Sequence, residues 1–164
     1  MVTSLAASVR RWLRIEEGRE SGWTLLVLAF ILILALVLRF WRIDAQSLWY
    51  DEGWSVHLAR ESVRSALAQA SSAGHTHPPG YYLLLMVWVR FFGSSVAAVR
   101  GLSALFGLFT VLAVYRVGAV LFDRPTGLVA AFILSIAPAH IIYSQEVRMY
   151  ALLALCFTAL LGLF

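Results

Sequence analysis

Four long apolar runs, separated by polar segments, dominate the chain. Residues 21–38 are uncharged and lead, past one arginine, into an aromatic pair, so this run is long enough to cross a bilayer core as a helix. A signal peptide is the rival interpretation, but its apolar core is shorter and precedes a small-residue cleavage site. Because the sequence RFWR follows instead, we expect a retained transmembrane helix at about 21–40.

The other runs predict three more transmembrane helices, at about 96–122, 127–143 and 149–164. Arg100 and Arg116 would be costly at mid-bilayer, but they lie near the two ends of one helix, where each side chain can reach its own interface. Pro125, in the turn sequence DRPT, separates two helices, and Pro138 can kink or end the second. The pattern therefore predicts an all-α polytopic integral membrane protein.

Residues 41–95 differ from these runs, because they carry acids, arginines and the polar segment SSAGHTH. We interpret them as a loop outside the lipid. Within this loop, residues 55–70 have apolar positions at helical spacing, which predicts an amphipathic helix along the membrane interface. Residues 81–92 are apolar but too short to span comfortably, so we expect an interfacial or re-entrant segment there.

Arginine placement predicts the orientation of the helices. Four arginines lie in residues 1–20, which we interpret as a cytoplasmic or interfacial leader, and two more flank the DRPT turn, so both segments are expected on the cytoplasmic side. If residues 81–92 do not span, the first loop and the polar sequence SQEVR at 144–148 share the outer face; if they do span, the two lie on opposite faces. We prefer the shared face, because it gives one charged cavity.

Composition supports a membrane protein and excludes other classes. The chain is 61% hydrophobic and 13% charged, whereas soluble domains are about 45–50% apolar and about 25% charged. The net charge of +4 comes from scattered arginines without a basic run, so no nucleic-acid partner is expected. Cys156 is the only cysteine, which rules out an internal disulfide, and no Cys/His metal pattern is present.

Asp51 and Glu52 form an acid pair among the three large aromatics of LWYDEGW. In one interpretation Asp51 caps a helix that begins near Ser55, and Glu52 interacts with the helix dipole. In the other, the pair supplies a general base, or a carboxylate that holds a metal or a sugar hydroxyl. The aromatics suit an interfacial belt under either interpretation.

The sequence HTHPPGYY also has two interpretations. His75 and His77 could bind a metal only in an extended segment, and no further close ligand is evident in the sequence. The Pro-Pro pair either makes a plain turn with Tyr81 and Tyr82 anchored at the interface, or forms a rigid loop that places histidine and tyrosine donors beside a sugar or phosphate.

The sequence SQEVRMY places Arg148 at the start of an apolar helix, where a charge must be paired or reach water. Pairing with Glu146 is one explanation. Binding of an anionic head group is the other, since guanidinium suits phosphate. We interpret His140, in the preceding apolar run, as an ordinary interface histidine.

In this order, the motifs resemble the N-terminal part of a GT-C membrane glycosyltransferase of the protein O-mannosyltransferase and aminoarabinose-transferase group (family 39 or 83 type). The sequences that carry the resemblance are RFWRID at 39–44, the acid pair of LWYDEGW, HPPGYY at 77–82, VRGLSALFG at 99–107, FDRPTGLVAA at 122–131 and SQEVRMYALL at 144–153. It implies a GT-C-like transmembrane bundle, over residues 21–164, whose first outer loop contains a juxtamembrane helix.

The resemblance also implies chemistry. Such enzymes transfer a sugar, with inversion, from a polyprenyl-phosphate carrier to a hydroxyl of a protein, lipid A or cell-envelope glycan. Asp51 would be the base, and Glu52 would help to position it. His77 with Tyr81 or Tyr82 would line the donor pocket. Arg148 would contact the lipid phosphate, and Glu146 would lie near the acceptor, although family members often have a second-loop aspartate instead.

The implied partners are membrane lipids, the lipid-linked sugar donor and the hydroxyl acceptor. No resident cofactor follows from the sequence, and a divalent metal is left open. We expect a multi-pass protein of a bacterial or archaeal plasma membrane with an outward-facing active site, and a chain that is a truncated piece of a longer enzyme. The competing hypothesis is a non-catalytic membrane protein or a transporter fragment, but a transporter should place its ionisable residues near the midplane.

Overall fold

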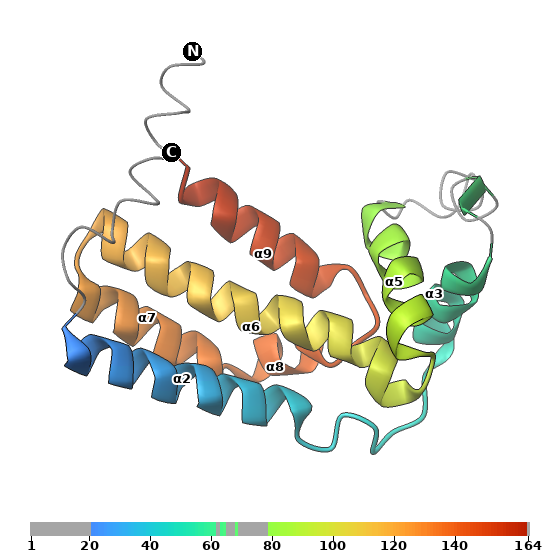
Figure 1. Ribbon diagram of the computed structural model, residues 1–164, viewed down its shortest axis with the longest axis horizontal. Coiled ribbons are helices and arrows are strands. Elements are labelled where there is room, and N and C mark those ends of the chain that lie inside the picture. Colours follow the sequence, from blue (N-terminus) through green and yellow to red (C-terminus); the bar gives the residue numbers. More distant parts are fainter. Residues whose placement is uncertain (1–20, 62, 65–67, 69–78, 164) are drawn as a thin grey trace, which may run out of the picture.

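The computed structural model describes residues 21–61, 63–64, 68 and 79–163, so the leader at 1–20 and the histidines of HTHPP lie outside the described residues. All secondary structure in these ranges is helical, which confirms the predicted all-α class (Figure 1). The helices discussed below are α2 (Gly22–Phe40), α3 (Tyr50–Arg60), α5 (Pro79–Phe92), α6 (Val96–Leu121), α7 (Arg124–Ile136), α8 (Pro138–Ser144) and α9 (Tyr150–Leu161).

Helix α6 is the centre of the bundle. It packs against α7, α9 and α2, while α3 and α5 pack on each other near its N-terminal end (Figure 1). Ile31, Val111, Tyr115 and Ala131 form a buried cluster between α2, α6 and α7. Many large apolar side chains of α2 remain exposed, among them Phe30 at 61%, as expected of a helix that faces lipid.

Two described helices, α2 and α6, are long and apolar enough to cross a membrane. Helices α7 and α8 would make a third span if taken together, but they are bent by 65°. The bend follows from Pro138, which begins α8 after the extended residue Ala137. Helix α5 is shorter than a span, as its length in the sequence predicts, and α9 is a short apolar helix as well.

The first loop contains a helix that begins before the predicted range of 55–70 and is interrupted at Glu61, while the described residues 63, 64 and 68 are also helical. Helix α3 begins at Tyr50 and ends at Arg60, where Glu61 adopts an extended conformation. Asp51 therefore lies in the first turn of α3 and is not its N-cap, a position that Trp49 occupies. The Glu52 carboxylate accepts a hydrogen bond from the Trp49 backbone N–H (3.3 Å), which satisfies a helix donor that otherwise has no partner.

Arg39, at the end of α2, is completely buried and contacts the chain on both sides of the break between α7 and α8. Its guanidinium donates to the carbonyls of Ser135 (3.2 Å) and Leu134 (3.4 Å), which lie at the end of α7. It also lies 2.8 Å from Nδ1 of His140. The interpretation of His140 as an ordinary interface histidine is therefore wrong, because its ring is a partner of a buried arginine.

Candidate active site at one end of the bundle

Glu52 is a fully buried carboxylate that joins three parts of the chain. It accepts hydrogen bonds from Nε (3.0 Å) and Nη2 (2.7 Å) of Arg100, which lies in α6. It also accepts the backbone N–H of Val147 (3.0 Å), in the segment between α8 and α9. A buried charge needs such partners to offset its lost hydration, so Glu52 holds the first loop, α6 and the second polar segment together.

Arg100 completes this arrangement by binding the chain between α2 and α3. Its guanidinium donates to the carbonyls of Ile43 (2.8 Å), Gln46 (3.0 Å) and Ser47 (3.3 Å). The expectation that Arg100 reaches out to an interface is therefore wrong, because its side chain is only 8% exposed and is paired within the protein. The sequence did show Arg100 as a charge inside an apolar run, but residue spacing did not indicate that Glu52 is its partner.

Asp51, next to Glu52, has a different environment. Its carboxylate forms an ion pair with Arg148, and the Asp51 side chain is 46% exposed whereas that of Arg148 is 12% exposed. The Arg148 guanidinium also lies 5.9 Å from the ring centre of Trp49 and 5.2 Å from that of Tyr150. The suggested pairing of Arg148 with Glu146 is wrong, because Asp51 takes that place.

The two tyrosines of HPPGYY point to different surroundings. The Tyr82 hydroxyl interacts with the Ser55 side chain and feels the charges of Arg148 and Asp51, and burial raises its pKa. Tyr81 is 1% exposed and its hydroxyl lies 2.8 Å from that of Ser103, so it is a core residue. That Tyr81 and Tyr82 line a donor pocket stays a prediction. Tyr82, itself only 5% exposed, is the tyrosine whose hydroxyl interacts with the charges of Asp51 and Arg148.

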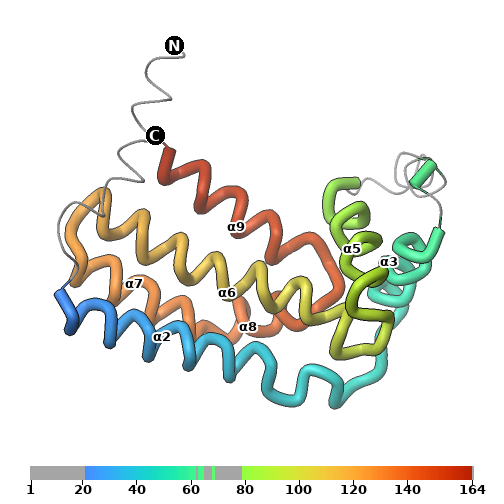
Figure 2. The backbone as a smooth tube through the Cα atoms, in the orientation of Figure 1, coloured from blue at the N-terminus to red at the C-terminus, as the bar shows by residue number. Residues whose placement is uncertain are grey.

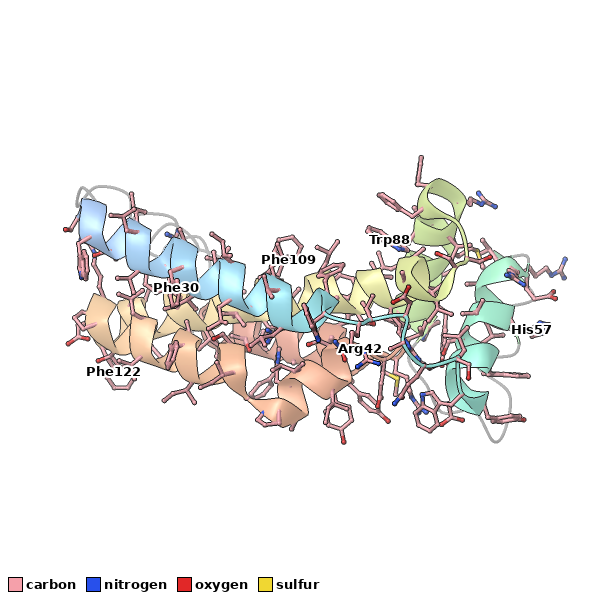
Figure 3. All side chains as sticks on the ribbon, turned by 90° about the horizontal axis from the view of Figure 1, so that it is seen from below. Phe30, Arg42, His57, Trp88, Phe109 and Phe122 are labelled. Atoms are coloured by element: carbon pink, nitrogen blue, oxygen red, sulfur yellow. The ribbon has the colours of Figure 1, made fainter. Side chains whose placement is uncertain are left out.

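A cavity of about 720 Å³ lies beside the Glu52–Arg100 pair, whose two residues line it, whereas Asp51 and Arg148 are not among the described residues that line it. Trp41, Trp49 and the segment between α2 and α3 line one part of it, and Glu146 lines another. Burial, and then the charge of Glu52, raise the pKa of Glu146. Arg42 also lines the cavity and has a positive φ of 52°, which is uncommon for a residue other than glycine. Figure 3 shows Arg42 in the connection between the bundle and α3.

Both polar segments therefore lie at the same end of the bundle, as the preferred topology predicts. The ends of α2 and α8 and the start of α9 approach α3 and α5 there (Figure 2). The contacts of Glu52 with Val147 and of Asp51 with Arg148 join the two segments directly. Gln145 adds a third link, since its amide donates to the Arg39 carbonyl (3.1 Å) at the end of α2.

The described residues contain no cluster of three or more histidine, cysteine or acidic side chains suited to a metal ion. His75 and His77, for which a metal site was one interpretation, lie outside those residues, as does the placement of His77 in a donor pocket. The polar groups that the described part of the chain brings to this end are carboxylates, guanidinium groups and the Tyr82 hydroxyl.

The fold and the site define the chain as an all-α membrane protein with acid–arginine pairs at one end of its helix bundle. Comparison of the sequence with family models then shows its family. The sequence model of the dolichyl-phosphate-mannose-protein mannosyltransferase family matches residues 76–164, more than half of the chain. The chain belongs to this family, whose members are glycosyltransferases of the GT-C kind. No curated protein and no solved structure matches the chain significantly.

Proposed function

We propose that this chain forms the N-terminal part of an enzyme that transfers a sugar, with inversion, from a polyprenyl-phosphate donor to a hydroxyl acceptor. The observation that carries this proposal is the Asp51–Arg148 ion pair at one end of an apolar bundle. It offers a base and a cation for phosphate side by side, where a substrate with a lipid tail can arrive from the membrane. Membership of a mannosyltransferase family supports mannose as the first sugar to test.

In this scheme Asp51 accepts the proton of the acceptor hydroxyl, and Arg148 stabilises the charge that develops on the leaving lipid phosphate. The phosphate is a good leaving group, so no covalent enzyme intermediate is needed. Glu52 positions Asp51 through the network with Arg100. Glu146, which lines the adjacent cavity, lies near the acceptor, and Tyr82 donates towards the donor's phosphate or sugar. His77 is assigned to the same donor pocket by the resemblance alone.

We place this site at the outer face of a bacterial or archaeal plasma membrane. The support is the distribution of arginines, since the DRPT turn at the opposite end of the bundle is flanked by Arg116 and Arg124. The acceptor would then be a protein, a lipid A or another cell-envelope glycan that displays a free hydroxyl.

The decisive test is transfer of labelled mannose from polyprenyl-phosphate mannose by the full-length protein in lipid nanodiscs. Asp51→Asn should lower the rate at least about 100-fold, because it removes a general base. Asp44→Asn is the matched control, since Asp44 is an exposed acid of the same loop and should keep the wild-type rate. Transfer by Asp51→Asn at the wild-type rate would show that Asp51 is not the base.

A further inference from the structure

In the structure, the proposed base is not free. Asp51 pairs with Arg148, and this pair uses the same guanidinium that the proposed function assigns to the lipid phosphate. An N–H group of Arg148 that binds the Asp51 carboxylate is not free to bind a phosphate, and the Asp51 oxygen that accepts it is not free to accept from an acceptor hydroxyl. The two roles proposed for Asp51 and Arg148 therefore conflict as long as they remain paired with each other.

We infer that the donor's phosphate displaces Asp51 from Arg148, so that donor binding itself frees the base. This inference rests on the proposed function and adds an order to it: the anion binds first, and the acceptor hydroxyl is activated second. The ligand class is a lipid-linked phosphate monoester or diester, which offers oxygens to a guanidinium in the geometry that a carboxylate uses. An acceptor hydroxyl cannot replace Asp51 in this way, because it carries no charge.

The surroundings of Arg148 favour this exchange. Its side chain is only 12% exposed and lies near the rings of both Trp49 and Tyr150, so it remains in place when one anion leaves and another arrives. The Asp51 side chain is 46% exposed, and partly exposed ion pairs are weak. A phosphate can therefore compete for the guanidinium.

The surroundings of Asp51 show that little else has to move. Its backbone is in the first turn of α3, and its carbonyl accepts a hydrogen bond from the Ser55 hydroxyl (3.0 Å). The neighbouring Glu52 is fixed by Arg100 and Val147. A rotation of the Asp51 side chain about its own bonds is then sufficient to leave Arg148, while α3 stays docked. The Tyr82 hydroxyl interacts with the Ser55 side chain and lies within electrostatic reach of both Asp51 and Arg148.

By contrast, Glu52 cannot take part in such an exchange. Its carboxylate is fully buried and accepts four hydrogen bonds, two of them from Arg100. Displacing it would leave a buried guanidinium without its partner. The adjacent acids are thus divided between a fixed pair that holds the backbone and an exchangeable pair that responds to the substrate.

The test is equilibrium binding of farnesyl phosphate, a sugar-free probe, to the full-length protein in nanodiscs, with uncharged farnesol as the parallel probe. Asp51→Asn should bind farnesyl phosphate about five- to tenfold more tightly than wild type, because the competing carboxylate is gone. Asp51→Ala should give the same gain, and neither variant should change the affinity for farnesol. Arg148→Gln should lose the preference for the phosphate.

Asp44→Asn is the matched control, because it removes one negative charge from an exposed side chain of the same loop that lies outside the Asp51–Arg148 pair. It should change the affinity for farnesyl phosphate less than about threefold. An equal gain in Asp44→Asn, or no gain in either Asp51 variant, would overturn the exchange. Because the assay contains no sugar, it tests the exchange separately from sugar transfer. If the exchange is right and the proposed transfer is wrong, the Asp51 variants would bind the phosphate more tightly while the wild-type protein would transfer no sugar.

Discussion

At the scale of single residues, two acids that are neighbours in the sequence have separate tasks. The Glu52 side chain is buried and bound by Arg100 and Val147, whereas the Asp51 side chain is half exposed and forms an ion pair with Arg148. The reason is helical geometry, because successive side chains on α3 point about 100° apart. The Glu52 side chain therefore faces the protein interior, while that of Asp51 is turned towards a more exposed position.

This difference predicts that two similar substitutions change the free energy of unfolding by very different amounts. Glu52→Gln should lower the free energy of unfolding by about 3–5 kcal/mol, since it leaves the buried Arg100 guanidinium without a countercharge. Asp51→Asn should change it by no more than about 1 kcal/mol, because that pair is partly exposed. Unfolding of the purified protein in detergent, followed by circular dichroism, measures both values.

A double-mutant cycle tests whether the stability loss of Glu52→Gln comes from its pair with Arg100. Arg100→Met removes the guanidinium while keeping much of the side-chain volume, and in the presence of Glu52→Gln it should cost much less than it does alone. Additive losses in the double variant would contradict the assignment of Glu52 and Arg100 to one unit.

At the scale of helices, hydropathy predicted the elements well, but it could not predict their contacts. The bounds of α2 and α6 lie within a few residues of the predicted runs, because an apolar run of that length has few alternatives in a membrane. Helix α3 began early, since the capping contact of Glu52 depends on a local geometry that periodicity does not reveal.

Residue spacing also could not predict contacts between residues far apart in the sequence, because these contacts depend on the geometry of the folded chain. Glu146 was the closer acid to Arg148 in sequence, yet Asp51 is its partner in the folded chain. The facing of Tyr81 and Tyr82 likewise depends on where α5 packs against α6, which Trp88 fixes by donating to the Ala98 carbonyl (2.7 Å). Sequence therefore named most of the site residues, and packing decided which of them meet.

Helices α6 and α7 meet through two glycines, Gly118 of α6 and Gly127 of α7, and this contact should be sensitive to a single methyl group. A Cβ added at Gly127 would lie 2.5 Å from the Tyr115 carbonyl oxygen and 2.8 Å from the Ala119 nitrogen. Because these are backbone atoms, the helices would have to move apart, and Gly127→Ala should cost about 1–3 kcal/mol of unfolding free energy in detergent.

Gly101→Ala, within α6, is the control for that prediction. Its added Cβ would make ordinary contacts of 3.8 Å with Trp88 and 3.9 Å with Phe40. Alanine is also the better helix former by about 0.5–1 kcal/mol. A stability loss as large at Gly101 as at Gly127 would argue against close backbone packing as the cause.

At the scale of the whole molecule, the contacts between the two polar segments require that both lie on one side of the membrane. The paths agree with this requirement: α6 runs from the site end of the bundle to the DRPT turn, and α7 with α8 returns to the site end (Figure 1). Helix α5 is shorter than a span, which agrees with the expectation that it does not cross the membrane. The bundle thus has a charged end that holds the candidate site and an opposite end at the DRPT turn.

This arrangement predicts a pattern of chemical labelling in intact cells. In a Cys156→Ser background, Gln46→Cys and Tyr143→Cys lie at the site end, and Phe122→Cys lies at the opposite end, where Figure 3 shows it; all three side chains are exposed. A membrane-impermeant maleimide should label the first two from the outside and Phe122→Cys only in inverted vesicles, because the proposed orientation puts the arginine-flanked turn in the cytoplasm. Labelling of all three in reverse would leave the shared site intact but turn it inward. Labelling of residues 46 and 143 from opposite sides would separate Asp51 from Arg148, and no shared base-and-phosphate site would then exist.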